Sequence, residues 1–238
     1  AKSCNTSFAQ MGLDLGGDKM VNGAQGFGFN SVPPFDLPAV ASHFKTDFTR
    51  NEPALAQSSI GQNETAATPL QMALVAAGVA NDGVIMEPHV VSEIRDGEGE
   101  LVKRYDPTEW KKATSPQTAQ IMREGMVEVV QNGSATRLQI EGLDVGAKTG
   151  TAQFGPAAPL RSHAWIIAWA ALPGQKASIA VAVIVENQSG ASESTGGRLA
   201  APIAKQVIEQ SFQPMPAPPA DTTGGSGSTS TTTTEAGN

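Results

Sequence analysis

Two short motifs hold the side chains best suited to chemistry, at residues 3–5 (Ser-Cys-Asn) and 148–151 (Lys-Thr-Gly-Thr). A lysine supplies a fixed positive charge, and threonine hydroxyls can bind a carboxylate or an amide. The second motif lies in a run typical of a strand, and a strand edge can pair with an extended peptide. Gly150 leaves room for the backbone of such a ligand to approach. The sequence therefore predicts a site for a peptide or a peptide analogue.

The order of the two motifs resembles that of one enzyme family. Serine–x–asparagine followed by lysine–threonine–glycine occurs in β-lactamases and penicillin-binding proteins. Further landmarks follow in family order at residues 60–62 (Ile-Gly-Gln), 68–73 (Thr-Pro-Leu-Gln-Met-Ala) and 163–166 (His-Ala-Trp-Ile). Over residues 1–212 the chain resembles the transpeptidase domain of class B penicillin-binding proteins, of the actinobacterial penicillin-binding protein A type. The resemblance implies an α+β penicillin-binding/β-lactamase-like transpeptidase fold, an antiparallel sheet flanked by helices, truncated at its N-terminal side.

The resemblance also implies a reaction. It is that of a peptidoglycan D,D-transpeptidase, which cross-links stem peptides ending in D-Ala-D-Ala through an acyl-serine intermediate and is inhibited by β-lactams. Ser3 would relay a proton, Asn5 would hydrogen-bond the substrate amide, and Lys148 would raise the positive potential and hold Ser3 in line. The threonine hydroxyls would bind the terminal carboxylate, and the Thr151 N–H would form half of the oxyanion hole. The implied substrate-binding residues are Thr149, Gly150 and Thr151. No cofactor and no metal are implied.

The family's nucleophile is a serine in Ser-x-x-Lys, upstream of Ser-x-Asn. We expect it to lie outside this chain, because the chain begins two residues before Ser3, and we expect this fragment alone to be inactive. One Ser-x-x-Lys string occurs, at residues 42–45, but it follows Ser-x-Asn. The polar stretch after it ends at Pro53, which does not suit a long buried helix. Ser42 is therefore predicted to be a surface or loop serine.

Composition restricts the class of protein. The net charge of −7 and the pI near 5.0 argue against nucleic acid as a partner. The single cysteine, Cys4, excludes a disulfide within the chain, and we expect it to be a small buried apolar group. The three histidines lack metal-ligand spacing, and the apolar runs are too short to span a bilayer. The resemblance implies an extracytoplasmic domain, anchored to the membrane through a segment absent from this chain, and division or elongation proteins as possible partners.

Other interpretations stay open. Ser3 and Asn5 alone could form a helix cap. A β-lactam-binding sensor or a non-catalytic division scaffold would carry the same motifs, and a serine β-lactamase would add a deacylating base. Neither Glu64, which precedes a helix start, nor Glu186, at a strand end, suits that role. His163 is as consistent with a structural role as with the margin of the cleft.

Periodicity and turn residues predict the elements. Helices are expected after residue 5, from Thr68 to residue 81, from Ser115 to Gly133 and after Gly197. Strands are expected at 145–152, 164–172 and 178–186, with a hairpin at 89–105 and a long irregular connection at 21–57. The expected inward side chains include Val90, Ile94, Leu101, Ile121, Ile203, Val207 and Ile208. Residues 213–238, rich in Pro, Gly, Ser and Thr, are predicted to form a disordered tail after a domain at 1–212.

Overall fold

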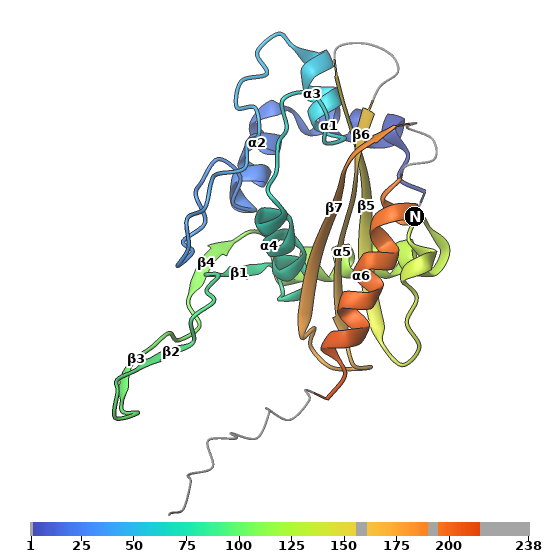
Figure 1. The fold of residues 1–238 in the computed structure, drawn as a ribbon. Helices are drawn as coiled ribbons and strands as arrows, with labels where there is room; N and C mark the ends of the chain where they lie inside the picture. The colour runs from blue at the N-terminus through green and yellow to red at the C-terminus, as the bar shows by residue number, and fades with distance from the viewer. Residues whose placement is uncertain (1, 156–160, 190–194, 215–238) are drawn as a thin grey trace, which may run out of the picture.

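The computed structural model describes residues 2–155, 161–189 and 195–214. Within them a three-stranded antiparallel sheet forms the centre, with helices on both of its faces and a separate group of short helices at one end (Figure 1). The mixed helix and antiparallel sheet confirm the predicted fold class. The predicted tail at 213–238 lies, but for its first two residues, outside the described part.

The sheet consists of β5 (Asp144–Phe154), β6 (Arg161–Ala171) and β7 (Ile179–Ser189), in that order. Runs of valine, isoleucine and alanine favour β6 and β7, because such side chains fit a pleated surface covered on both faces. Lys148 of β5 lies opposite Ile167 of β6, and Thr151 opposite Ala164. The Gln175 N–H donates to the Leu172 carbonyl at 2.9 Å in the predicted turn between β6 and β7. All three strands are confirmed: β5 is longer than predicted at both ends, β6 begins three residues earlier than predicted, and β7 ends three residues later.

Three long helices pack on the sheet: α4 (Pro69–Ala80), α5 (Pro116–Asn132) and α6 (Gly196–Ser211). Thr68 caps α4 by accepting a hydrogen bond from the Gln71 N–H, and Ser115 caps α5 through the Thr118 N–H. A proline at the first helical position follows each cap, where its missing N–H costs no hydrogen bond. A 3₁₀ turn, η1 (Thr136–Leu138), leads from α5 into β5. In the part of the chain that the structure describes, no helix is long and apolar enough to cross a membrane.

Two core clusters cover the two faces of the sheet. Ile166 belongs to the cluster with α6, whereas its neighbour Ile167 belongs to the cluster with α4, because successive strand residues point to opposite faces. Helix α5 contributes to both clusters, with Val130 in the first and Met126 in the second. The sheet is thus fixed from both sides at the level of the Lys-Thr-Gly motif.

Helix α6 contacts the sheet through small residues. Gly196, Ala200, Ala204 and Ile208 recur every four residues and are buried. The predicted inward Ile203 and Val207 are instead each 44% exposed, so that part of the prediction was wrong. The apolar periodicity marked the larger side chains, but close approach to the strands requires the face that carries alanine and glycine.

The N-terminal part holds α1 (Asn5–Leu15), α2 (Gly17–Gly26) and α3 (Glu52–Ser58). The predicted helix after residue 5 is confirmed. The prediction of an irregular connection at 21–57 was wrong at both ends, where α2 and α3 lie, and right between them. There Asn30 organises the chain, because its side-chain amide exchanges hydrogen bonds of 2.9 Å with the N–H and carbonyl of Phe44.

Four short strands lie away from the sheet. Strand β1 (Val84–Met86) pairs with β4 (Glu109–Lys112), which sequence analysis missed, and β2 (Glu93–Arg95) pairs with β3 (Leu101–Arg104) in the predicted hairpin. The hairpin projects from the body (Figure 1), so its apolar residues have no core to face. The prediction of inward side chains was wrong for Val90, Ile94 and Leu101, and also for Ile121 on α5.

Candidate active site

The two motifs meet although 145 residues separate them. The Lys148 ammonium donates a hydrogen bond of 2.8 Å to the Ser3 hydroxyl. Strand β5 fixes Lys148, and Ser3 lies in the short segment that precedes α1. Ser3 has a φ of 54°, a left-handed conformation that a serine adopts only when its surroundings impose it. The contact with Lys148 is thus held against a local backbone preference.

Lys148 is a partly buried cation with neutral partners. Its ammonium also donates to the Thr149 carbonyl at 2.8 Å, and among the described residues no carboxylate forms a salt bridge with it. Burial lowers the pKa of the Lys148 ammonium, because a low-dielectric surrounding disfavours the charged form. A cation without a carboxylate partner is free to attract an anionic ligand.

One edge of β5 offers its backbone to the cleft. The Thr149 carbonyl accepts a hydrogen bond of 2.8 Å from the Lys148 ammonium. The Thr151 carbonyl accepts one of 3.1 Å from the Gln62 side-chain amide. Residues two apart in a strand direct their backbone groups the same way, and the N–H and C=O of one residue share a direction. The geometry therefore leaves this stretch of β5 able to pair with an extended ligand once the Gln62 amide withdraws.

A cavity of about 380 Å³ joins the motifs, and all six residues predicted for the site line it. Those six are Ser3, Asn5, Lys148, Thr149, Gly150 and Thr151. Gln62, Ser134 and Thr195 also line it, and sequence analysis assigned none of them a role. Gln62 could have been noted from the Ile-Gly-Gln landmark, but Ser134 and Thr195 stand in no pattern that singles them out.

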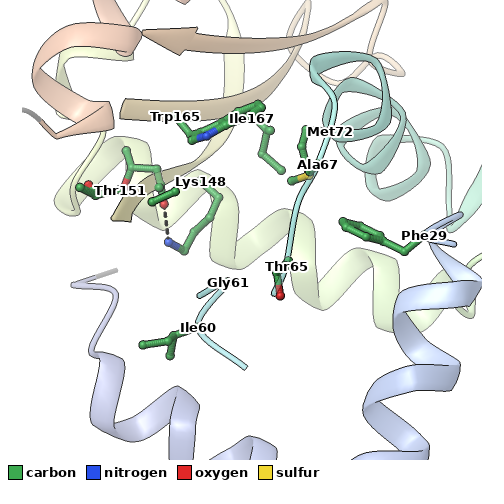
Figure 2. A pocket seen from close by; sticks show the side chains of 13 residues that line it. Phe29, Ile60, Gly61, Thr65, Ala67, Met72, Lys148, Thr151, Trp165 and Ile167 are labelled. Carbon is green, nitrogen blue, oxygen red and sulfur yellow. Dashed lines mark hydrogen bonds between the residues drawn. The ribbon is translucent and has the colours of Figure 1, made fainter. Parts of the chain in front are cut away.

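A second cavity, of about 280 Å³, borders the same four residues of β5 (Figure 2). Its other walls are mostly apolar, with Phe29, Met72 and Ile167 among them. Figure 2 shows the hydrogen bond of Lys148 at one end of this space and Phe29 at the other. Residues 148–151 thus divide a polar cavity from an apolar one.

Helix α6 reaches the motif because its first two residues are glycines. A Cβ at Gly196 would overlap the Trp165 carbonyl oxygen and lie 2.9 Å from the Gly150 oxygen. A Cβ at Gly197 would overlap the backbone carbonyl oxygen of Ser134. The two glycines let the positive end of the helix dipole approach the cleft, where it favours an anion.

The string at residues 42–45 is not a nucleophile. Ser42 lies in a loop, as predicted, but it is buried rather than on the surface, and its hydroxyl accepts a hydrogen bond from the Thr68 N–H at 3.0 Å. The Lys45 ammonium pairs with the Glu64 carboxylate at 3.0 Å, so it does not serve as a base for Ser42. Both residues stabilise the chain ahead of α4.

The structure also places three other residues considered from the sequence, Cys4, His163 and Glu186. The expectation of a buried Cys4 was wrong: it is exposed, and hydrogen bonds from Ser7 and Thr6 lower the pKa of its thiol to about 7. His163 stacks on Phe154 with ring centroids 4.3 Å apart, and its Nδ1 accepts from the Asn187 N–H, which indicates a structural role. Glu186 is exposed on β7. Among the described residues no group of three or more His, Cys, Asp or Glu could hold a metal ion.

Comparison with known proteins supports the interpretation of these motifs. The family model for the penicillin binding protein transpeptidase domain matches residues 1–209. The chain is 40% identical over 213 residues to the peptidoglycan D,D-transpeptidase PbpA of Mycolicibacterium smegmatis, covering 87% of this chain and 42% of that protein. It is 38% identical over 220 residues to PbpA of Mycobacterium tuberculosis, covering 90% and 43%. The chain therefore spans less than half the length of these curated relatives.

Solved structures of penicillin-binding proteins show the same likeness. Penicillin-binding protein A of M. tuberculosis, solved as its ceftriaxone acyl-enzyme complex, superposes with a TM-score of 0.80 at 38% identity, covering 89% of this chain and 47% of that one. The D,D-transpeptidase domain of a peptidoglycan glycosyltransferase from Eggerthella lenta gives a TM-score of 0.76 at 33% identity, covering 89% and 52%. The predicted resemblance and fold are confirmed.

Proposed function

The chain belongs to the penicillin-binding protein transpeptidase domain family, and from that premise we propose that the intact protein is a peptidoglycan D,D-transpeptidase. Its substrates would be stem peptides ending in D-Ala-D-Ala, and β-lactams would acylate it. The observation that carries the proposal is the hydrogen bond of 2.8 Å between the Lys148 ammonium and the Ser3 hydroxyl. It joins the two family motifs in one cavity, as a proton relay to a serine nucleophile requires.

The reaction assigns a task to each residue. A serine nucleophile, which the resemblance places ahead of Ser3, attacks the carbonyl of the penultimate D-Ala and gives up its hydroxyl proton. The bond to the terminal D-Ala breaks, and Ser3 relays that proton to the leaving amine. The amine of a second stem peptide then attacks the acyl-serine, and the serine regains its proton. Lys148 holds Ser3 in line, and Asn5 hydrogen-bonds the substrate amide.

Strand β5 would receive the ligand. The hydroxyls of Thr149 and Thr151 would bind the terminal carboxylate, and Lys148 would add positive potential. The Thr151 N–H would donate to the oxyanion, because it shares its direction with the carbonyl that faces Gln62. Gly150, without a side chain, would let the peptide backbone approach the strand.

Two alternatives differ in the fate of the acyl-enzyme. A β-lactamase needs a base for deacylation, but the Glu64 carboxylate is paired with Lys45 at 3.0 Å, which argues against it. A sensor or scaffold would bind β-lactams without joining stem peptides. A transpeptidation assay with an acceptor amine separates that alternative, because only an enzyme forms the cross-linked product.

The location and partners belong to the same proposal. The cell wall is cross-linked outside the cytoplasm, so the domain would work there, anchored by a segment outside this chain. Proteins of a division or elongation complex would be its partners. Relatives named for peptidoglycan synthesis support the location but do not identify the complex.

Labelling of the intact protein with a fluorescent penicillin tests the proposal. We expect Lys148→Ala to lower the second-order acylation rate constant about 100-fold or more, since the variant loses charge stabilisation in the transition state. The matched control, Glu64→Ala, removes a charge that is paired with Lys45 outside the cleft. Its rate constant should stay within about twofold of the wild-type value, as for an exposed ion pair. Comparable rates for Lys148→Ala and the wild type would refute the site.

A further inference from the structure

We propose that Ser134 is a positioning residue, which directs the Thr149 hydroxyl toward the carboxylate of the bound ligand. This inference rests on the proposed function. The Ser134 Oγ lies 2.6 Å from the Thr149 Oγ1, and both side chains line the cavity that holds Lys148 and Thr151. Ser134 comes from the segment between α5 and η1, fifteen residues before Thr149.

The number of hydroxyl protons decides which of the two side chains can bind the ligand. A threonine hydroxyl has one proton to donate, and a carboxylate can only accept. If Thr149 donates to Ser134, it has no proton left for the ligand. If Ser134 donates to Thr149, the Thr149 proton is free to point into the cavity. A bound carboxylate selects the second arrangement, because a hydrogen bond to a charged acceptor is stronger than one between hydroxyls.

The position of Ser134 is fixed by its backbone. The N–H groups of Gly133 and Ala135, on either side of it, both donate to the Val129 carbonyl at 3.1 Å. On the other side lies Gly197, where a Cβ would overlap the Ser134 carbonyl oxygen and lie 3.6 Å from the Thr149 Cγ2. The start of α6 thus packs against both members of the hydroxyl pair, which holds them in register.

Helix α5, which ends just before Ser134, offers a second hydroxyl pair for comparison. At the opposite end of α5 the Ser115 Oγ lies 2.9 Å from the Thr118 Oγ1, so it too is a serine–threonine hydroxyl pair on an exposed surface. Ser115 accepts the Thr118 N–H and caps the helix, and neither residue lines the cavity. If the loss of any such hydroxyl pair slowed acylation, Ser115→Ala would slow it too. If the effect belongs to the site, only Ser134→Ala should slow it.

The test measures acylation of the intact protein by a β-lactam with a free carboxylate and by its methyl ester. For the acid, we expect Ser134→Ala to lower the second-order rate constant about five- to tenfold, the worth of one hydrogen bond. The limiting acylation rate at saturation should not change, because the carboxylate is bound equally in the ground and transition states. For the ester, Ser134→Ala and wild type should react alike. Ser134→Thr should restore the rate with the acid.

Each outcome decides whether Ser134 positions the Thr149 hydroxyl. A wild-type rate for Ser134→Ala with the acid would overturn the assignment, and so would an equal loss with the ester, since the effect would not pass through the carboxylate. Ser115→Ala should lower the thermal midpoint without changing either rate constant, and equal losses of acylation in both variants would also overturn the assignment. Failure of the wild type to be acylated would overturn the proposed function itself, and this inference with it.

Discussion

The sheet with α4, α5 and α6 differs from the N-terminal helices α1 to α3 in how apolar side chains are placed. Around the sheet, Ala168, Ala204 and Ile208 are fully buried. On α1, Phe8 and Leu15 are exposed and Met11 is 62% exposed, although they share one helical face. The sheet region also carries exposed apolar side chains, such as Ile121 and Ile203, but its helices pack on clusters of buried ones, whereas the only buried residue of α1 is Gly12. The cleft lies between the two regions, with Lys148 on the first and Ser3 on the second.

The difference has a consequence for the site. Packing on both faces fixes the position of Lys148 and the threonines, because interiors at close-packed density allow little movement. Helix α1 packs within the described residues mainly through Gly12, where a Cβ would overlap the Ser59 side chain. The hydrogen bond from Lys148 to Ser3 therefore joins a rigid element to one with fewer buried contacts.

Glycine substitutions should show the largest contrast between the regions. In Gly196→Ala the new Cβ would overlap the Trp165 carbonyl, a backbone atom that cannot move aside, and α6 would be displaced from the sheet. We expect a loss of about 3 kcal/mol or more in the free energy of unfolding, measured by urea denaturation. The control, Gly23→Ala in α2, has nothing within 4 Å of the added atom. It should gain about 0.5 to 1 kcal/mol, so similar losses in both would contradict the comparison.

Truncation of apolar side chains should give a smaller contrast. Ile208→Ala removes a fully buried side chain between α6 and the sheet, and should cost about 2 to 3 kcal/mol through lost transfer energy and an added cavity. Met11→Ala removes a side chain that is 62% exposed, and should change stability by less than about 0.5 kcal/mol. Equilibrium unfolding of the two variants, in this chain and in the intact protein, measures both. A large cost for Met11→Ala in the intact protein alone would show that its face of α1 is covered there.

The sequence predicted the sheet region better than the helices around it. Strands β6 and β7 were located because runs of valine, isoleucine and alanine between turn residues are a local signal, and β5 was located through the Lys-Thr-Gly motif that it carries. The starts of α4 and α5 were located because Thr68 and Ser115 are caps followed by proline. The inward face of α6 was located only in part, at Ile208, since alanine carries little apolar signal although it sets the distance between helix and strand.

In the site, too, local motifs were predicted and contacts that depend on the tertiary fold were not. The two motifs and their six residues were predicted from residue type, order and resemblance, and the structure brings all six to one cavity. Gln62 and Ser134 contribute through hydrogen bonds to Thr151 and Thr149 that depend on tertiary approach. No spacing in the chain encodes such a contact. The exposure of Cys4 was also unpredictable, because it depends on what covers α1 rather than on the motif itself.

The rigid side of the cleft can be tested through Thr151. Thr151→Val keeps the shape and the N–H but loses the hydroxyl, so it should weaken acylation by a charge-assisted hydrogen bond of about 1.5 to 3 kcal/mol. Thr151→Ser keeps both groups and should have a mild effect. Acylation kinetics of the two variants in the intact protein measure the difference. Equal rates would mean that the hydroxyl does not touch the ligand, and the carboxylate would then depend on Thr149 alone.

The smallest expected contrast is between two helix N-caps that are both threonine. Thr68 begins α4 and accepts a hydrogen bond from the Gln71 N–H at 3.1 Å, whereas Thr195 begins α6 without a side-chain cap and lines the cavity. Thr68→Ala should cost about 1 kcal/mol of stability, because one N–H at the helix start loses its acceptor. Thr195→Ala should cost less than about 0.5 kcal/mol, because no cap bond is lost. Thermal unfolding of the two variants under one set of conditions measures this. A cost for Thr195→Ala as large as that for Thr68→Ala would mean that α6 is held at its start by the threonine, rather than by the fit of its two glycines against β5 and β6.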